Sequence, residues 1–547
     1  MLEHRPTAHR TGKVPARQDF WWRGAVIYQI YPRSFCDGDG DGVGDFKGIL
    51  TKIDYLAALG VDVIWISPFY RSPMKDFGYD VQNYCEIDPI FGDMADFDAV
   101  LAAVHKRGLK LMMDFVPSHT SDQHAWFVES RSDRTNAKAD WYVWADAKSD
   151  GTPPNNWISI FGGSAWAWEP RRRQYYLHNF LAEQPDMNFH CQAAVDALIA
   201  QARFWLERGV DGFRVDAIDF GVHDPDLPDN PVRNHSGRAP QTPYDMQYQR
   251  YNKALPELSD LFLKPLWRAT DDFPSRALLG EISGDHALTR MAEYSMGGGL
   301  DMTYSFDLLT VEPKAAAIRA IIETLEAEIG DGWPCWAFSN HDVRRSATQF
   351  GGSNPDPRVG RFVPVLLGSL RGTICIYQGE ELGLPEAEIA NEDMVDPVGI
   401  RFYPDNPGRD GCRTPMPWQA GATHVGFSSA APWLPVCEAH RLLAVDRQES
   451  DPASVLHATR QFLQWRKQQS CLIDGAIEFV DAPEPLLAFA RQNDTQKLLC
   501  VFNLSANPAR LTLDAGFQLT DCPANNASLE NQSIDVAGWG VAILKSG

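Results

Sequence analysis

VDALIAQARFWLERG-VDGFRVDAIDF (residues 195–220) places an amphipathic helix, a glycine and a buried strand in immediate succession. Apolar side chains recur at helical spacing up to Arg208. Gly209 then stands where a helix ends in the left-handed conformation that glycine adopts without steric cost. The strand that follows is apolar almost throughout, which is typical of a parallel strand covered on both faces. This stretch therefore predicts one helix–strand unit of a layered α/β fold.

The same unit occurs twice earlier in the chain, with Gly60 and Gly108 at the ends of the helices. The two copies are IDYLAALG-VDVIWISPFY (53–70) and FDAVLAAVHKRG-LKLMMDFVPSH (97–119). Further strands are expected at AVIYQIYP (25–32), RALLGEIS (276–283), MTYSFDLL (302–309), WPCWAFSNHD (333–342) and TICIYQGEE (373–381). Eight strands with helical segments between most of them predict a (β/α)8 TIM barrel.

Two regions depart from this rhythm. Residues 120–183 are rich in Trp, Asn, Asp, Pro and Gly, and predict a small domain inserted after the third strand. After a helix at 454–468 the pattern changes to short alternating runs, which predict a C-terminal antiparallel β-sandwich domain. The expected organisation is a tail (1–19), a first barrel part (20–119), the insertion (120–183), a second barrel part (184–469) and the β domain (470–547).

The composition limits the classes of partner. The 547 residues contain 50 Lys+Arg and 72 Asp+Glu, a net charge of −22, which argues against nucleic acid and anionic membrane surfaces. No apolar run approaches the ~18–20 residues that a membrane-spanning helix needs. Ten scattered cysteines without a CxxC pair favour reduced thiols and a cytoplasmic protein. The expected partner is small and neutral, and the oligomeric state stays open between monomer and homodimer.

Polar side chains gather at the carboxyl ends of the predicted strands, which is where barrel enzymes carry their active sites. Burying several carboxylates without partners would be costly, so their convergence indicates chemistry rather than packing. These strand-end residues are Asp114, His119, Arg214, Asp216, Glu281, His341 and Asp342. The long Pro- and Asp-rich loops 221–255 and 385–412 are expected to line the same end.

Four segments resemble the signature regions of the α-amylase superfamily, glycoside hydrolase family 13. They are DFVPSH (114–119), GFRVDA (212–217), LLGEIS (278–283) and FSNHD (338–342). Supporting matches are DFGYDVQNY (76–84), QPDMNF (184–189), IYQGEELGLP (376–385) and GRDGCRTPMPW (408–418). QPDMNF is similar to a signature of the α-glucosidase and oligo-1,6-glucosidase group, and the resemblance runs over essentially the whole chain from Trp21.

The resemblance implies that Asp216 is the nucleophile, Glu281 the general acid/base and Asp342 the transition-state stabiliser. Further implied substrate-binding residues are Asp76, Tyr79, His119, Phe161, Arg214, Ala217, His341 and one of Arg409 and Arg413, of which Arg409 is favoured. Asp76 would close the non-reducing end of an exo-acting pocket, Tyr79 would stack on the sugar, and Phe161 would form an aromatic wall.

The two central carboxyl groups need different proton affinities. A retaining glycosidase uses one ionised carboxylate to attack the anomeric carbon and one protonated carboxyl to protonate the leaving oxygen. Arg214 lies two residues from Asp216 on the same strand face, so we expect it to hold Asp216 ionised. Glu281 follows LLG, a less polar setting that should raise its pKa.

The resemblance thus implies a retaining, exo-acting α-glucosidase that hydrolyses short saccharides such as maltose, with sucrose and aryl α-glucosides as further donors. In this group Val after the nucleophile goes with α-1,6 bonds and Thr or Ala with α-1,4 bonds, so Ala217 favours α-1,4. A sugar or alcohol could capture the glucosyl-enzyme, which makes transglucosylation the nearest alternative.

The same scaffold occurs in two alternative classes of protein. One is a glucosyltransferase, including an isomerase that forms sucrose isomers or trehalose. The other is a non-catalytic relative, such as the ancillary subunits of amino-acid transporters. That reading fits poorly, because this chain keeps all three carboxylates and shows no membrane-spanning segment.

The loop DGDGDGVGD (37–45) predicts a metal site. Asp37, Asp39, Asp41 and Asp45 offer carboxylate oxygens at spaced positions, the Val43 carbonyl fits between the last two, and a glycine stands sixth. The twelfth position holds Gly48 rather than Glu, which excludes an EF-hand. Structural Ca²⁺ is expected, with Mg²⁺ as the alternative, and no organic cofactor is expected.

Overall fold

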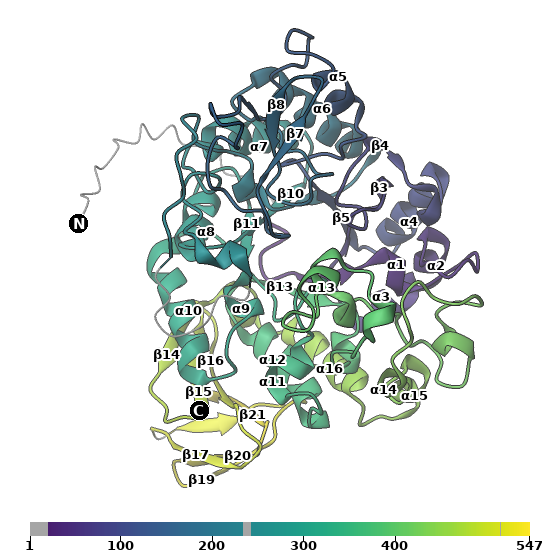
Figure 1. The fold of residues 1–547 in the computed structure, drawn as a ribbon. Coiled ribbons are helices and arrows are strands. Elements are labelled where there is room, and N and C mark those ends of the chain that lie inside the picture. Colours follow the sequence, from purple (N-terminus) through teal and green to yellow (C-terminus); the bar gives the residue numbers. More distant parts are fainter. Residues whose placement is uncertain (1–19, 234–241, 515, 547) are drawn as a thin grey trace.

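The computed structural model describes residues 20–233, 242–514 and 516–546, so the expected tail (1–19) lies outside the described residues. An eight-stranded parallel sheet has the order β11-β10-β9-β5-β2-β1-β13-β12. A parallel bridge between Thr303 and Pro334 joins its two ends, so the sheet closes into the predicted barrel (Figure 1). Its strands are β1 (Val26–Ile30), β2 (Val63–Ile66), β5 (Lys110–Phe115), β9 (Gly212–Val215), β10 (Ala277–Ile282), β11 (Met302–Ser305), β12 (Cys335–Trp336) and β13 (Thr373–Tyr377).

Helices alternate with these strands and cover the outside of the barrel. The predicted glycine stops are confirmed at Gly60 and Gly209, which have left-handed φ angles of 95° and 108° and cap their helices. The main outer helices are α3 (Ile53–Leu59), α4 (Met94–Lys106), α6 (Gln192–Arg208), α7 (Lys264–Asp271), α8 (Ala287–Ser295), α10 (Ala315–Ile329), α12 (Pro357–Ser369) and α16 (Val455–Arg466).

Both faces of the barrel strands are buried, which explains their continuous apolar character. Ile27, Trp65, Met112 and Leu279 belong to the cluster that fills the barrel interior. The alternate side chains, such as Ile64, belong to the larger core between strands and helices. Because side chains alternate along a strand, these two cores fix which residues point into the barrel mouth.

Two predicted strands are shorter than expected. The strand expected at 333–342 is only β12, which ends at Trp336, so His341 and Asp342 lie in the loop beyond it. The segment 302–309 continues as a strand only to Ser305, and residues Phe306–Leu309 form the short helix α9. The Ser305 side chain accepts a hydrogen bond from the backbone N–H of Asp307, which caps the helix and ends the strand.

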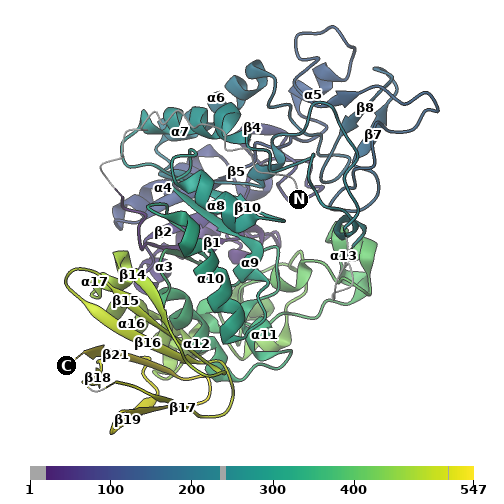
Figure 2. The same ribbon diagram turned by 90° about the vertical axis from the view of Figure 1, so that its left-hand side faces the viewer.

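The segment between β5 and α6 forms the insertion expected after the third strand. Its elements are α5 (Ala125–Ser130) and the antiparallel strands β6 (Trp144–Ala145), β7 (Trp166–Glu169) and β8 (Gln174–Leu177). Both ribbon views show it at the end of the molecule opposite the C-terminal sheets (Figures 1 and 2).

The C-terminal region consists of two antiparallel sheets, as predicted. The first has the order β14-β15-β16-β21-β18 and the second β17-β20-β19. Their strands are β14 (Ala476–Val480), β15 (Leu486–Gln492), β16 (Lys497–Asn503), β17 (Ala509–Thr512), β18 (Phe517–Leu519), β19 (Ala527–Glu530), β20 (Ser533–Val536) and β21 (Val541–Ser546). Buried Arg491 donates to the carbonyls of Ser369 and Leu370 at the end of α12, which ties this region to the barrel.

The cysteines and the helices fit the earlier expectations of reduced thiols and no spanning segment. All ten cysteines lie in the described part of the chain and are free. Among the helices of residues 20–233, 242–514 and 516–546, none combines the length and apolar character needed to cross a bilayer.

Candidate active site

Strand register brings the central site residues together. Asp114 on β5 pairs with Arg214 on β9, and Glu281 on β10 pairs with Tyr304 on β11. Asp216 follows the last residue of β9. All five side chains are nearly or fully buried at the same end of neighbouring strands.

The guanidinium of Arg214 is shared by three carboxylates. It contacts Asp216 and Glu281 directly, and its Nη1 lies 2.5 Å from Asp114 Oδ1. The Tyr304 hydroxyl donates to Glu281 Oε1 over 2.8 Å, and the Trp65 indole N–H donates to Asp114 over 3.0 Å. The three carboxylates therefore share one fully buried cation.

This sharing corrects one expectation about ionisation. Burial raises the pKa of Asp216 well above its ordinary value, although Arg214 opposes the effect, so Arg214 does not by itself hold Asp216 ionised. Burial also raises the pKa of Glu281, as expected, and that of Asp114 to about 6. Burial thus raises the pKa of all three carboxyl groups around the one guanidinium, and groups this close titrate as one cluster.

Asp342 has the opposite electrostatic environment. Its Oδ1 lies 2.8 Å from Arg413 Nη2 and 3.2 Å from Arg409 Nη1. Although burial alone would raise its pKa, His341 and the two arginines hold the pKa of Asp342 well below its ordinary value. Asp342 is therefore the constantly ionised carboxylate of the site.

The two candidate arginines differ in exposure. Arg409 also bonds Asp76 Oδ1 over 2.8 Å and Asp396 Oδ1 over 2.7 Å, and its side chain is 15% exposed. The Arg413 side chain is 1% exposed and donates to the carbonyl of His341. Arg409 is therefore the better placed to contact a ligand. Arg413 is buried and holds the His341–Asp342 segment in place.

The aromatic and histidine candidates surround these charges. Tyr79 stacks on His341 with ring centroids 5.4 Å apart, and its hydroxyl bonds the same ring. Burial lowers the pKa of His341 to about 3 and that of His119 to about 4, so both rings are neutral at pH 7. Phe161 lies under Arg409, whose guanidinium carbon is 5.4 Å from the ring centroid.

Ala217 joins the segment of Asp216 to the strand of Glu281. Its φ angle is +39°, a left-handed conformation that is unusual for alanine and that often occurs at functional sites. Its backbone N–H donates to Glu281 Oε2 over 3.1 Å. The strained turn therefore fixes Asp216 and Glu281 relative to each other.

Three contact residues were not singled out from the sequence. Gln184 donates to Asp76 over 3.2 Å and lies 3.1 Å from His119 Nε2, and its signal was its place at the start of QPDMNF. Tyr304 could have been found from strand alternation, because it follows Met302 on the inward face. No sequence pattern marked Asp396 as a site residue, because it contacts Arg409 from an irregular loop.

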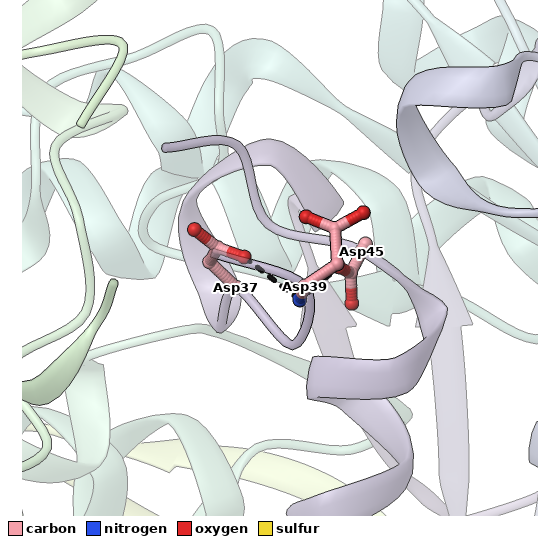
Figure 3. A group of neighbouring side chains, drawn as sticks. All are labelled: Asp37, Asp39 and Asp45. Carbon is pink, nitrogen blue, oxygen red and sulfur yellow. Dashed lines mark hydrogen bonds between the residues drawn. The ribbon is translucent and has the colours of Figure 1, made fainter. Parts of the chain in front are cut away.

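The acidic loop gathers three of its four aspartates. Carboxylate oxygens of Asp37, Asp39 and Asp45 lie within 4.8 Å of one another, which would suit a hard cation (Figure 3). Asp41 is exposed and is not part of this group among the described residues. Ser428 donates to Asp37 over 2.5 Å, which fixes the loop against the barrel's final segment.

A closed barrel with buried carboxylates, three arginines and stacked rings at one mouth is typical of a carbohydrate-processing barrel enzyme. The family description "Alpha amylase, catalytic domain" matches residues 29–475. A probable alpha-glucosidase of Rhizobium meliloti is 53% identical over 89% of this chain and 90% of its own length.

Solved structures agree with this class. The alpha-glucosyl transfer enzyme XgtA is 53% identical, with a TM-score of 0.95 over 97% of this chain and 100% of that one. The trehalulose synthase MutB from Pseudomonas mesoacidophila MX-45 is 33% identical, with a TM-score of 0.87 over 96% and 99%. The chain belongs to glycoside hydrolase family 13, in the group of the α-glucosidases and oligo-1,6-glucosidases.

Asp186, in the QPDMNF segment beside Gln184, provides a test of the buried electrostatics. Burial raises its pKa to about 8, although Asn179 donates to it, so the native carboxyl is protonated at pH 7 while the unfolded one is not. Stability from this group is present at low pH and is lost as pH rises through about 4 to 8. We expect Asp186→Asn to gain stability relative to the wild type by ~2–4 kcal/mol between pH 5 and pH 8, measured from thermal unfolding.

Asp196→Asn, an exposed change on α6, serves as the control and should show no such pH dependence. A stability difference between Asp186→Asn and the wild type that stays constant from pH 5 to pH 8 would contradict the protonated state of Asp186.

Proposed function

We propose that this protein is a retaining, exo-acting α-glucosidase that hydrolyses terminal α-glucosyl bonds of short saccharides such as maltose. The observation that supports it most directly is the clustering of Asp216 and Glu281 around one buried arginine, with Asp342 held ionised beside them. Small neutral α-glucosides are the proposed substrates, and the cytoplasm is the proposed location.

Asp216 attacks the anomeric carbon as Glu281 gives its proton to the leaving glycosidic oxygen. The bond between carbon and leaving oxygen breaks, and a β-glucosyl ester on Asp216 forms. Glu281, now ionised, removes a proton from water, whose oxygen attacks the same carbon, releases Asp216 and restores the α configuration. The competent protonation state has a proton on Glu281, which leaves Arg214 to stabilise Asp216.

The pocket would hold a single glucose at its closed end. Asp76 is fixed by Arg409 and by Gln184, and Gln184 also reaches His119. These groups form a continuous polar wall beside the stacked Tyr79 and His341 rings. Such a wall suits the hydroxyls of a terminal sugar, which supports exo action.

Ala217 supports a preference for α-1,4 bonds. Its side chain lies beside the hydrogen bond to Glu281, next to the position of the leaving group. The pattern of the group, in which Thr or Ala at this position goes with α-1,4 bonds and Val with α-1,6 bonds, is the basis for this preference. Sucrose and aryl α-glucosides are further proposed donors.

Transfer to another acceptor is the second candidate. The glucosyl-enzyme can react with a sugar or alcohol in place of water, and the structural neighbours include a protein described as an alpha-glucosyl transfer enzyme and a trehalulose synthase. A product profile from maltose at low and high concentration, with added alcohol, separates hydrolysis from transfer.

We also propose that the loop 37–45 binds a structural cation, Ca²⁺ in preference to Mg²⁺. Asp37, Asp39 and Asp45 would supply carboxylates, with Asp41 and the Val43 carbonyl as further proposed ligands. The three grouped carboxylates repel one another, and a divalent ion offsets that repulsion. Its contribution would be to fix the loop between α1 (Pro32–Phe35) and α2 (Phe46–Thr51), not to take part in the reaction.

The nucleophile assignment is tested by Asp216→Asn. Because the amide cannot form the glucosyl ester, we expect kcat for p-nitrophenyl α-glucoside to fall by roughly 10³-fold or more, with the melting temperature nearly unchanged. Asp226→Asn, an exposed change in the following loop, is the control. Proton NMR should show α-glucose as the first product from maltose; β-glucose would rule out the retaining mechanism.

The linkage proposal is tested by a matched pair at position 217. Ala217→Val adds two methyl groups beside Glu281, and we expect the ratio of kcat/KM for maltose to that for isomaltose to fall about tenfold, ~1.4 kcal/mol. Ala217→Thr has nearly the same shape and should keep the maltose preference. Equal maltose-to-isomaltose ratios of kcat/KM in Ala217→Val and Ala217→Thr would contradict the linkage proposal.

The cation is tested by metal analysis and chelation. We expect about one Ca²⁺ per chain in the purified protein, and chelation should lower the melting temperature by a few degrees because the acidic loop loses its countercharge. Asp37→Asn should reduce the metal content, whereas Asp150→Asn, at an exposed site, should not. Unchanged metal content and melting temperature after chelation would remove the site.

A further inference from the structure

Lys253 and Asp219 form a buried ion pair beside the catalytic carboxylates. The Lys253 ammonium lies 3.1 Å from Asp219 Oδ2, and the two residues are 3% and 0% exposed. Asp219 lies in the short helix η2 (Ile218–Phe220), three residues after Asp216. Lys253 comes from the far end of the loop 221–255, so the pair ties that loop to the nucleophile segment.

The ammonium is held on several sides. It donates to Ser283 Oγ over 2.8 Å and lies 4.1 Å from the centroid of the Phe220 ring. Gly284 leaves the space for it, because a Cβ there would lie 3.1 Å from Lys253 Nζ and its φ of +84° favours glycine. These contacts make up a specific binding site for the Lys253 ammonium.

Asp219 depends on that cation for its countercharge. Its Oδ2 also accepts from the Ser283 backbone N–H over 3.3 Å, while its Oδ1 has no hydrogen-bond partner among the described residues. The other titratable groups facing it are the phenols of Tyr244 and Tyr294, whose pKa values burial raises, so they carry no charge. An Arg233–Asp285 pair on the flanking loops is already internally neutral.

The pair is close to the acid/base. Ser283, which contacts both members of the pair, lies two residues beyond Glu281, so their Cα atoms are about 7 Å apart. Glu281 in turn accepts from the backbone of Ala217, two residues before Asp219. Solvent screens buried charges little, so the pair and the Glu281 carboxyl interact through a short stretch of protein. Replacing a buried pair by apolar groups is often neutral or stabilising, so stability alone does not account for this one.

We propose that Lys253 is a positioning residue of the proposed glycosidase: it cancels the charge of Asp219 and holds η2 against the strand that carries Glu281. The Asp114–Asp216–Glu281 cluster is thereby kept free of a further buried negative charge. This inference rests on the proposed function for its activity readout.

The test is the pH profile of kcat/KM for p-nitrophenyl α-glucoside in four variants. Lys253→Gln keeps a hydrogen-bond donor but leaves Asp219 charged. Both the acidic and the basic limb of the kcat/KM profile should therefore move to higher pH by roughly 0.5–1 pH unit. Asp219→Asn leaves the ammonium unopposed, so both limbs should move down by a similar amount. Lys253→Arg and the double variant Lys253→Gln/Asp219→Asn should restore the wild-type profile.

The exposed pair Lys264–Asp260 provides matched controls. Lys264→Gln and Asp260→Asn make the same charge changes 2.7 Å apart on the surface, and neither should move the profile. Shifts of the same sign, or none, in Lys253→Gln and Asp219→Asn would overturn the proposal. If Lys253→Gln does not fold, the downward shift of Asp219→Asn and its reversal in the double variant decide the question.

A stability measurement separates this proposal from the proposed function. Lys253→Gln leaves a buried carboxylate without its countercharge, and its ionised form is costly to bury, so the melting temperature should fall relative to the wild type as pH rises. Asp219→Asn leaves a buried ammonium unopposed, so its melting temperature should fall relative to the wild type as pH falls. Inactivity of the wild type would refute the glucosidase, whereas parallel melting profiles would refute the buried pair.

Discussion

The site depends on one fully buried guanidinium. Arg214 contacts three carboxylates that come from three neighbouring strands, and it is the cation that they share. Removing these charges from water would be prohibitive without such a partner, and one positive charge cannot neutralise three negative ones. Burial accordingly raises the pKa of all three carboxyl groups, and a retaining glycosidase requires a raised pKa on its acid/base.

A second group of charges completes the pocket from loops rather than strands. Arg409 joins Asp76, Asp342 and Asp396, which come from three separate segments. Because Asp342 has two arginines and the Arg214 cluster has one, the carboxylates of a single mouth have very different proton affinities. The contrast between an always-ionised Asp342 and a Glu281 with a raised pKa arises from this unequal distribution of cations.

The loops around the mouth are tied to this centre by buried polar contacts. Lys253 anchors the loop 221–255 to η2, and the Phe220 ring beneath it packs on Phe180, which contacts His119. Asn252, the residue before Lys253, donates to Asn179 in the inserted segment. Buried contacts thus connect the loop 221–255, the inserted segment and the turn after Asp216, although they are far apart in the sequence.

The sequence by itself determined the barrel, because helix periodicity, glycine stops and continuous apolar strands are local properties; all eight strands lie within the expected segments, although β11 and β12 end early. Alternation along the strands also placed Asp114, Arg214 and Glu281, whereas His119, His341 and Asp342 lie in loops beyond β5 and β12. Only the tertiary structure decided which charges lie together. Arg214 contacts Asp114 and Glu281 as well as Asp216, and Asp396 contacts Arg409. Asp41 lies apart from the other loop aspartates. Proton affinity depends on burial and on every charge nearby, and those neighbours come from distant segments whose approach no local pattern encodes.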